Sequence, residues 1–140
     1  MENIDLIKEA IKAQKNSYSP YSKYPVGACI EAEDGKLFFG CNIENSAYGV
    51  SNCGERTALF SAVADGHKKF RKIAIVGGKL KDFAYPCGVC RQALSEFAPD
   101  IEVVLGKYDE NKNLIIKSYK LSELLPHSFG TKILTENFDD

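Results

Sequence analysis

Two short stretches of the sequence hold the residue types best suited to chemistry. Residues 53–56 read Cys-Gly-Glu-Arg, and residues 86–90 read Pro-Cys-Gly-Val-Cys. A Cys-x-x-Cys pair across the first turn of a helix brings two sulfur atoms within reach of one ion, and Cys53 could supply a third ligand. Three protein ligands leave a fourth position for water, whose pKa a bound zinc ion lowers toward about 7. The pattern therefore predicts a metal site that activates water.

Two further residues of the first motif, Glu55 and Arg56, suit the same chemistry. Glu55, in the first turn of a helix, can bend toward an ion lying off the helix end and can carry a proton from water to a substrate. Three thiolates and one divalent ion leave a net negative charge, which weakens zinc as a Lewis acid. Arg56 can offset this charge by donating hydrogen bonds to the thiolates. Outside such a site, a first-turn glutamate usually only compensates the helix dipole and an arginine usually lies at the surface.

Both cysteine motifs must stand at helix starts for this arrangement to form. Apolar residues at helical spacing predict helices over 53–64 and 87–97, which are ended by the Asp-Gly pair at 65–66 and by the Pro-containing segment 98–100. A helix start presents unpaired backbone donors and a partial positive charge. We therefore expect the thiolate forms of these cysteines to be stabilised.

The remaining segments alternate between strand and helix patterns. The expected elements are an amphipathic helix over 3–15, an aromatic loop over 17–25, a hairpin of strands 26–32 and 36–41 turning at Asp34-Gly35, a polar loop over 42–52, strands over 72–76, 101–105 and 114–118, a brief helix over 121–125, and a tail over 128–140. This order predicts an α/β fold, a three-layer α-β-α sandwich around a central mixed sheet. We expect residues 1–140 to form a single domain, since a chain of 140 residues suits one core.

Composition argues against several kinds of partner. The formal net charge of -1 gives no general attraction to nucleic acid polymers or to an acidic membrane surface. There is no run of about 18 apolar residues, and the first residues lack the pattern of a signal peptide. We therefore expect a cytoplasmic protein with a small-molecule substrate.

Cysteine usage fits the same compartment. Five cysteines are an odd number, and in a reducing compartment they serve as ligands, catalytic groups or core residues more often than as disulfides. Cys29 and Cys41 lie in apolar strand patterns and are expected to be structural. Cys53, Cys87 and Cys90 remain for the metal.

The spacing Cys53-x-Glu55 with Pro86-Cys87-x-x-Cys90 resembles the three-cysteine form of the zinc nucleoside and nucleobase deaminases. Further segments are similar to the small cytidine deaminases across most of the chain. They are residues 42–49 (Asn-Ile-Glu-Asn-Ser-Ala-Tyr-Gly), 53–58 (Cys-Gly-Glu-Arg-Thr-Ala), 86–92 (Pro-Cys-Gly-Val-Cys-Arg-Gln), 21–28 (Tyr-Ser-Lys-Tyr-Pro-Val-Gly-Ala) and 125–129 (Leu-Pro-His-Ser-Phe).

The resemblance implies a cytidine deaminase fold and a hydrolase that converts cytidine and deoxycytidine to uridine and deoxyuridine with release of ammonia, a step of pyrimidine salvage. It implies one Zn²⁺ per subunit, held by the cysteines at 53, 87 and 90. Glu55 would protonate the ring nitrogen and later the departing amine. Asn42 and Glu44 would bind the ribose hydroxyls.

The resemblance also implies roles at the base and between subunits. Tyr24, where relatives commonly carry phenylalanine, would stack on the pyrimidine, and the backbone N–H of Gly54, where many relatives have alanine, would hold the base. The short cysteine-type members are homotetramers whose sites borrow residues from neighbours. Tyr48 and Phe129 would complete the pocket of another subunit.

Three alternatives stand beside this interpretation. The first is a zinc-stabilised binding module in which Cys41 or His127 closes the coordination shell and Glu55 is dispensable. The second is a redox protein that uses Cys87 and Cys90 as a dithiol. The third is a related deaminase acting on a nucleotide or a nucleoside antibiotic. The lack of a basic cluster around the motifs argues against a phosphorylated or polymeric substrate.

Overall fold

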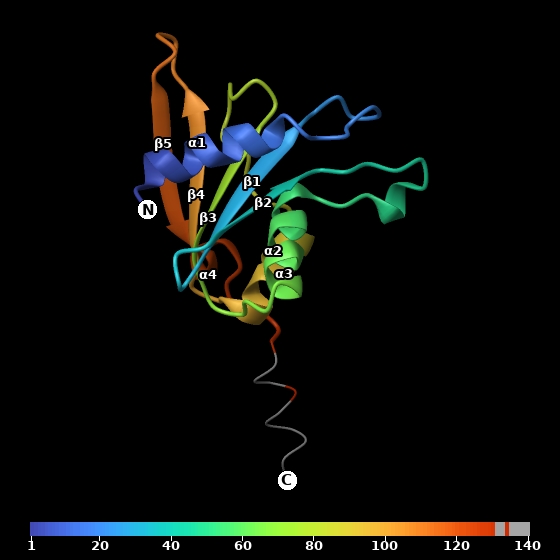
Figure 1. Ribbon diagram of the computed structural model, residues 1–140, viewed down its shortest axis with the longest axis vertical. Coiled ribbons are helices and arrows are strands. Elements are labelled where there is room, and N and C mark those ends of the chain that lie inside the picture. The colour runs from blue at the N-terminus through green and yellow to red at the C-terminus, as the bar shows by residue number, and fades with distance from the viewer. Residues whose placement is uncertain (131–133, 135–140) are drawn as a thin grey trace.

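A five-stranded sheet with helices on both of its faces forms the body of the protein (Figure 1). The computed structural model describes residues 1–130 and 134. Its elements in chain order are α1 (Asn3–Gln14), β1 (Val26–Ala32), β2 (Leu37–Cys41), the short 3₁₀ helix η1 (Tyr48–Val50), α2 (Gly54–Ala64), β3 (Phe70–Gly77), α3 (Gly88–Phe97), β4 (Glu102–Tyr108), β5 (Leu114–Lys120) and α4 (Leu121–Leu124). The predicted tail over 128–140 falls largely outside the described residues.

The sheet is mixed, as the sequence predicts. Its strand order is β2-β1-β3-β4-β5. β3 and β4 pair in parallel, whereas the other neighbours pair antiparallel. The parallel pair follows from α3, because a helix between two strands of one sheet carries the chain back to the end where the first strand began. The β1–β2 pair follows from the turn at Gly35, which has a φ of 91° that suits glycine.

Each face of the sheet is covered by its own apolar cluster. On one face, buried side chains of α1 pack with Cys29, Ala74 and Val104. On the other face, buried side chains of α2 and α3 pack with Ile30 and Ile73. Alternate residues of the strands face the two clusters, as the pleat of a strand requires. The three-layer α-β-α fold is therefore confirmed.

Helix α2 lies against the backbone of β2 at Gly40. A Cβ atom added at Gly40 would lie 2.2 Å from the carbonyl oxygen of Gly54 and 2.3 Å from the backbone nitrogen of Ala58. Only glycine allows this approach, because both neighbouring atoms belong to the helix backbone and cannot rotate away. The contact fixes the start of α2, and with it Cys53 and Glu55.

Several boundaries differ from the sequence prediction. β3 begins at Phe70 rather than at residue 72, and β4 and β5 run on to Tyr108 and Lys120. These additions are pairs at strand ends, such as Lys107 with Ile115. The predicted polar loop over 42–52 contains η1. In the described part of the chain, no helix combines the length and apolar character needed to span a membrane.

Candidate metal centre

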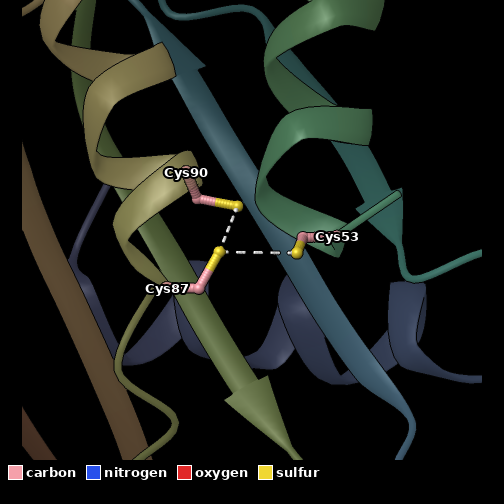
Figure 2. Close-up of side chains that lie close together, drawn as sticks. All are labelled: Cys53, Cys87 and Cys90. Atoms are coloured by element: carbon pink, nitrogen blue, oxygen red, sulfur yellow. Dashed lines mark hydrogen bonds between the residues drawn. The ribbon is translucent and has the colours of Figure 1, made fainter. Parts of the chain in front are cut away.

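Three cysteine sulfurs meet where α2 and α3 begin. Cys53 is the N-cap residue of α2 and Cys87 the N-cap residue of α3, while Cys90 is buried in the first turn of α3. Figure 2 shows the three side chains pointing toward one another from the two helices. The Sγ atom of Cys87 lies 3.7 Å from that of Cys53 and 3.5 Å from that of Cys90. The sequence predicted this cluster, and the fold assembles it.

The spacing of the sulfurs fits a tetrahedral zinc ion. Zinc–sulfur bonds of about 2.3 Å at tetrahedral angles separate two sulfurs by about 3.8 Å. The measured separations are close to this value, and all three sulfurs lie within 4.8 Å of one another. Neither Cys41 nor His127 belongs to this cluster among residues 1–130 and 134. The described residues therefore offer three ligands, the number found in a zinc site that keeps a fourth position open for water.

The surroundings of the sulfurs favour the thiolate form at Cys53 but not at Cys90. The pKa of Cys53 is lowered to about 5, first because the thiol of Cys90 hydrogen-bonds to it and also because Arg56 lies beside it. The same hydrogen bond raises the pKa of Cys90, which keeps the shared proton. Nη2 of Arg56 donates to Sγ of Cys53 over 3.5 Å. A divalent cation among the sulfurs would take the place of that proton, since zinc is bound by thiolates.

Glu55 is buried beside the sulfurs. Its side chain is 5% exposed and lines the same cavity as Cys53 and Cys87. Burial raises the pKa of Glu55 to about 7, and the nearby charge of Cys53 adds to this effect. A carboxyl group with such a pKa can both accept and donate a proton near neutral pH. Glu55 is thus equipped to act as a general acid and base.

The cavity in front of Glu55 has a volume of about 310 Å³ and is also lined by Tyr24, Asn42 and Gly54. The hydroxyl of Tyr24 lies so close to Gly77 that a Cβ atom there would be 2.3 Å from it. Asn42 supports this wall, because its Nδ2 donates to the carbonyl oxygen of Tyr24 over 2.9 Å and its Oδ1 accepts from the backbone N–H of Val26 over 2.8 Å. The structure thus brings three of the four predicted substrate residues to the cavity.

Glu44, the fourth predicted substrate residue, lines a different cavity of about 360 Å³ together with Tyr48. Its carboxylate accepts hydrogen bonds from the backbone N–H groups of Tyr21 and Ser22, each over 3.0 Å, and from the hydroxyl of Ser22. The hydroxyl bond is the main reason why the pKa of Glu44 lies below its ordinary value. Glu44 is therefore held as a carboxylate, in a cavity distinct from that of Glu55.

Tyr48 and Phe129 both point their rings toward solvent. Tyr48 is 75% exposed and meets Tyr21 edge-on, with ring centroids 5.8 Å apart. Phe129 is 55% exposed, and its carbonyl oxygen accepts a hydrogen bond from Gln92 over 2.8 Å. Neither lines the cavity that holds Glu55. Within one copy of the described chain, the two residues do not meet the metal cluster.

Sequence reasoning missed several residues around the site. Phe83, Ala84 and Tyr85, between β3 and α3, also line the cavity. Arg91 clamps the segment before Cys87, because its Nε donates to the carbonyl oxygen of Pro86 and its Nη1 to that of Leu124, each over 2.7 Å. Their position next to the Pro-Cys-x-x-Cys motif, on one side or the other, is the sequence feature that could have identified them.

Comparison with known proteins agrees with this geometry. The family model "Cytidine and deoxycytidylate deaminase zinc-binding region" matches residues 1–107, which include both cysteine motifs. A cytidine deaminase of Sporosarcina psychrophila is 45% identical over 130 residues, 93% of each chain. A blasticidin-S deaminase of Bacillus cereus is 30% identical over 132 residues, 89% of this chain and 90% of the relative. The crystal structure of cytidine deaminase from Burkholderia pseudomallei superposes on this chain with a TM-score of 0.83 and a sequence identity of 42%. The match covers 92% of this chain and 100% of the Burkholderia chain. The chain therefore belongs to the zinc-binding cytidine and deoxycytidylate deaminase family.

Proposed function

We propose that the protein removes the amino group of cytidine and deoxycytidine by hydrolysis, giving uridine or deoxyuridine and ammonia. One observation carries the proposal. Three sulfurs at the spacing of a zinc site share a cavity with a buried carboxyl group whose pKa is raised to about 7. The relatives named cytidine deaminase support cytidine as the substrate, and the higher identity to one of them than to the blasticidin-S deaminase points the same way.

The chemistry needs a nucleophilic water and two proton transfers. Cys53, Cys87 and Cys90 would hold a zinc ion, which would supply Lewis acidity and lower the pKa of water toward about 7. Glu55 accepts a proton from the water and donates it to the ring nitrogen beside the carbon under attack. It then carries the second water proton to the amino group, so that the carbon–nitrogen bond breaks and ammonia leaves. One water is consumed, and Glu55 returns to its starting state.

Arg56 and the cavity walls serve this reaction in defined ways. We assign to Arg56 the partial neutralisation of the thiolates through its contact with Cys53. Tyr24 stacks on the pyrimidine, and the backbone N–H of Gly54, which lines the cavity, donates to the base. Asn42 faces the sugar from the same cavity. Glu44, held as a carboxylate, accepts from the ribose hydroxyls once the two cavities are bridged by substrate.

We further infer a homotetramer in which Tyr48 and Phe129 complete the pocket of a neighbouring subunit. Their high exposure within one copy supports a partner that covers them. We also propose that residues 1–140 form one catalytic domain and that each subunit binds one zinc ion. The free cysteines support a reducing, cytoplasmic setting, in which the reaction serves pyrimidine salvage.

The variant Glu55→Gln tests the proton transfers. It keeps the size of the side chain but cannot carry a proton, so we expect full zinc content and a loss of turnover of at least about 100-fold. The control is Glu96→Gln, an exposed glutamate of α3, which should keep the parent rate. Turnover of Glu55→Gln at the parent rate would remove Glu55 from the mechanism, and a zinc-free parent enzyme would remove the metal.

The substrate is tested by a panel of cytidine, deoxycytidine, cytosine, deoxycytidylate and blasticidin S, followed by absorbance. The expected order places the two nucleosides first. Cytosine should react poorly, because the groups that bind the sugar would be left without partners. Preferential turnover of deoxycytidylate or of blasticidin S would overturn the nucleoside assignment.

The trans role of Phe129 is tested by mixing subunits. Phe129→Ala and Glu55→Gln are each expected to be poorly active as pure oligomers. If Phe129 serves a neighbour, a mixed oligomer contains sites with an intact Glu55 and an intact Phe129 from different subunits, and activity returns. Mixtures that stay inactive after subunit exchange, or an enzyme that sediments as a monomer, would contradict the shared site.

A further inference from the structure

One wall of the catalytic cavity rests on the two C-terminal strands of the sheet. Phe83 and Tyr85 line the cavity, and both belong to the segment that runs from β3 to α3. The face of β4 and β5 beneath them carries Lys107, Lys117 and Tyr119, which extend the row of buried Val103 and Leu105. The wall is therefore supported by residues that follow it in sequence by more than twenty positions.

The support of Tyr85 is a hydroxyl contact. The hydroxyl oxygens of Tyr85 and Tyr119 lie 3.0 Å apart, and the two rings meet at 54° with centroids 5.7 Å apart. Within the described residues, Tyr119 is the hydrogen-bond partner of the Tyr85 side chain. Tyr119 is half-buried and packs against the apolar cluster beneath α2 and α3, so it offers a firm base.

Two lysines complete the support. Nζ of Lys117 lies 5.9 Å from the ring centroid of Tyr119 and 5.6 Å from that of Phe83. Nζ of Lys107 lies 5.0 Å from the Phe83 ring. These distances are within the range of cation–π attraction. Lys117 thus contacts both the base of the wall and the wall itself.

The neighbouring metal segment has a separate attachment. The carbonyl oxygen of Pro86 is held by Arg91, which is itself tied to Leu124. This clamp fixes the backbone that leads into Cys87, but it does not hold the ring of Tyr85. Loss of the Tyr119 hydroxyl should therefore loosen the cavity wall while the metal ligands keep their places.

We propose that Tyr119, backed by Lys117, is a positioning residue that fixes the Tyr85 side of the catalytic cavity and thereby sets the affinity for the pyrimidine nucleoside. The inference rests on the proposed function. Tyr119 touches neither the sulfurs nor Glu55, so it acts on bound substrate and transition state alike. A contact of this kind changes KM and leaves kcat nearly unchanged.

The test compares Tyr119→Phe, Tyr85→Phe and the double variant with Tyr108→Phe, a control on β4 outside the cavity that holds Glu55. Each single variant should raise KM for cytidine about twofold to tenfold, the range that one hydrogen bond carries. The double variant should have the same KM as the single variants, because each single substitution already removes the hydrogen bond between Tyr85 and Tyr119. Lys117→Gln should shift KM in the same direction by a smaller factor, and Tyr108→Phe should match the parent.

Two measurements separate positioning from a structural defect. Calorimetric binding of the product uridine should weaken by the same factor as KM rises, and zinc content should stay at the parent level. A parent KM in Tyr119→Phe, or KM effects of the two tyrosines that multiply, would overturn the positioning role. A fall in both kcat and zinc content in Tyr119→Phe would instead show that Tyr119 is needed for the stability of the fold. A parent enzyme that binds uridine yet leaves cytidine unchanged would refute the proposed function itself, and the inference with it.

Discussion

Replacing Gly40 by alanine should separate the two halves of the metal site. The added Cβ atom would lie 2.2 Å from the carbonyl oxygen of Gly54 and 2.3 Å from the nitrogen of Ala58. Ordinary contact for a Cβ atom begins at 3.4 Å, so α2 must retreat from β2 by about 1 Å. Cys53 moves with α2, whereas Cys87 and Cys90 stay with α3.

The cost of this shift follows from its nature. Overpacking costs about 1–3 kcal/mol, and a clash between two backbones belongs at the upper end because no rotamer relieves it. For a chain of this size, about 3 kcal/mol lowers the melting temperature by about 9 °C. Displacing one of three ligands by about 1 Å should weaken zinc binding by at least about tenfold.

Calorimetric melting and a competition titration with a zinc chelator measure the two effects. Gly130→Ala is the control, because nothing lies within 4 Å of a Cβ atom at that position. A Gly40→Ala variant that melts with the parent and holds zinc as tightly would refute the close contact between α2 and β2 and its role in placing Cys53.

Three further outcomes are expected. Arg56→Gln removes the donor to Cys53 and should lower kcat about tenfold while zinc stays bound, and Arg56→Lys should recover part of the loss; parent kcat in Arg56→Gln would deny the tuning role. Burial raises the pKa of Cys29 from its ordinary 9.0 to about 12, so the folded state keeps a proton that the unfolded chain releases. The free energy of unfolding should therefore fall as pH rises from about 9 to about 12, and denaturant titrations should show a shallower fall in Cys29→Ala. Ser22→Ala removes a hydrogen bond from the Glu44 carboxylate and should move its lowered pKa back toward the ordinary value in an NMR titration, whereas an unchanged pKa would contradict that cause.

The parts of the fold that local chemistry determines could be predicted from the sequence. Asp34-Gly35 marked the hairpin because only glycine readily takes the positive φ found there. Cys53 and Cys87 were expected at helix starts, and both are N-cap residues. The meeting of the three sulfurs also agrees with the prediction, in which the Cys87-x-x-Cys90 spacing suits one ion and Cys53 supplies a third ligand.

The parts that depend on distant pairing could not be predicted. β4 runs on through Lys107 because Ile115 pairs with it across the β4–β5 hairpin. Phe83 and Tyr85 lie outside every element that the sequence predicts, and their contacts with Lys117 and Tyr119 of β5 join segments that are far apart in the chain. The separation of Glu44 from the cavity of Glu55 is likewise a matter of how two loops are placed. Neither the charges nor the residue spacing along the chain indicate how close such distant residues lie in the folded protein.

The closeness of the three sulfurs has a consequence for the metal-free protein. Cys87 and Cys90 have sulfurs 3.5 Å apart, and a disulfide needs about 2.05 Å, so a closure of about 1.5 Å would join them. The sulfur of Cys53, on the neighbouring helix, lies 3.7 Å from that of Cys87, so oxidation could join this pair as well. Bound zinc would therefore also protect its own ligands. In a subunit stripped of its ion, oxygen would take two electrons and two protons from a pair of these thiols, and the disulfide so formed would block uptake of zinc until a reductant reopened it.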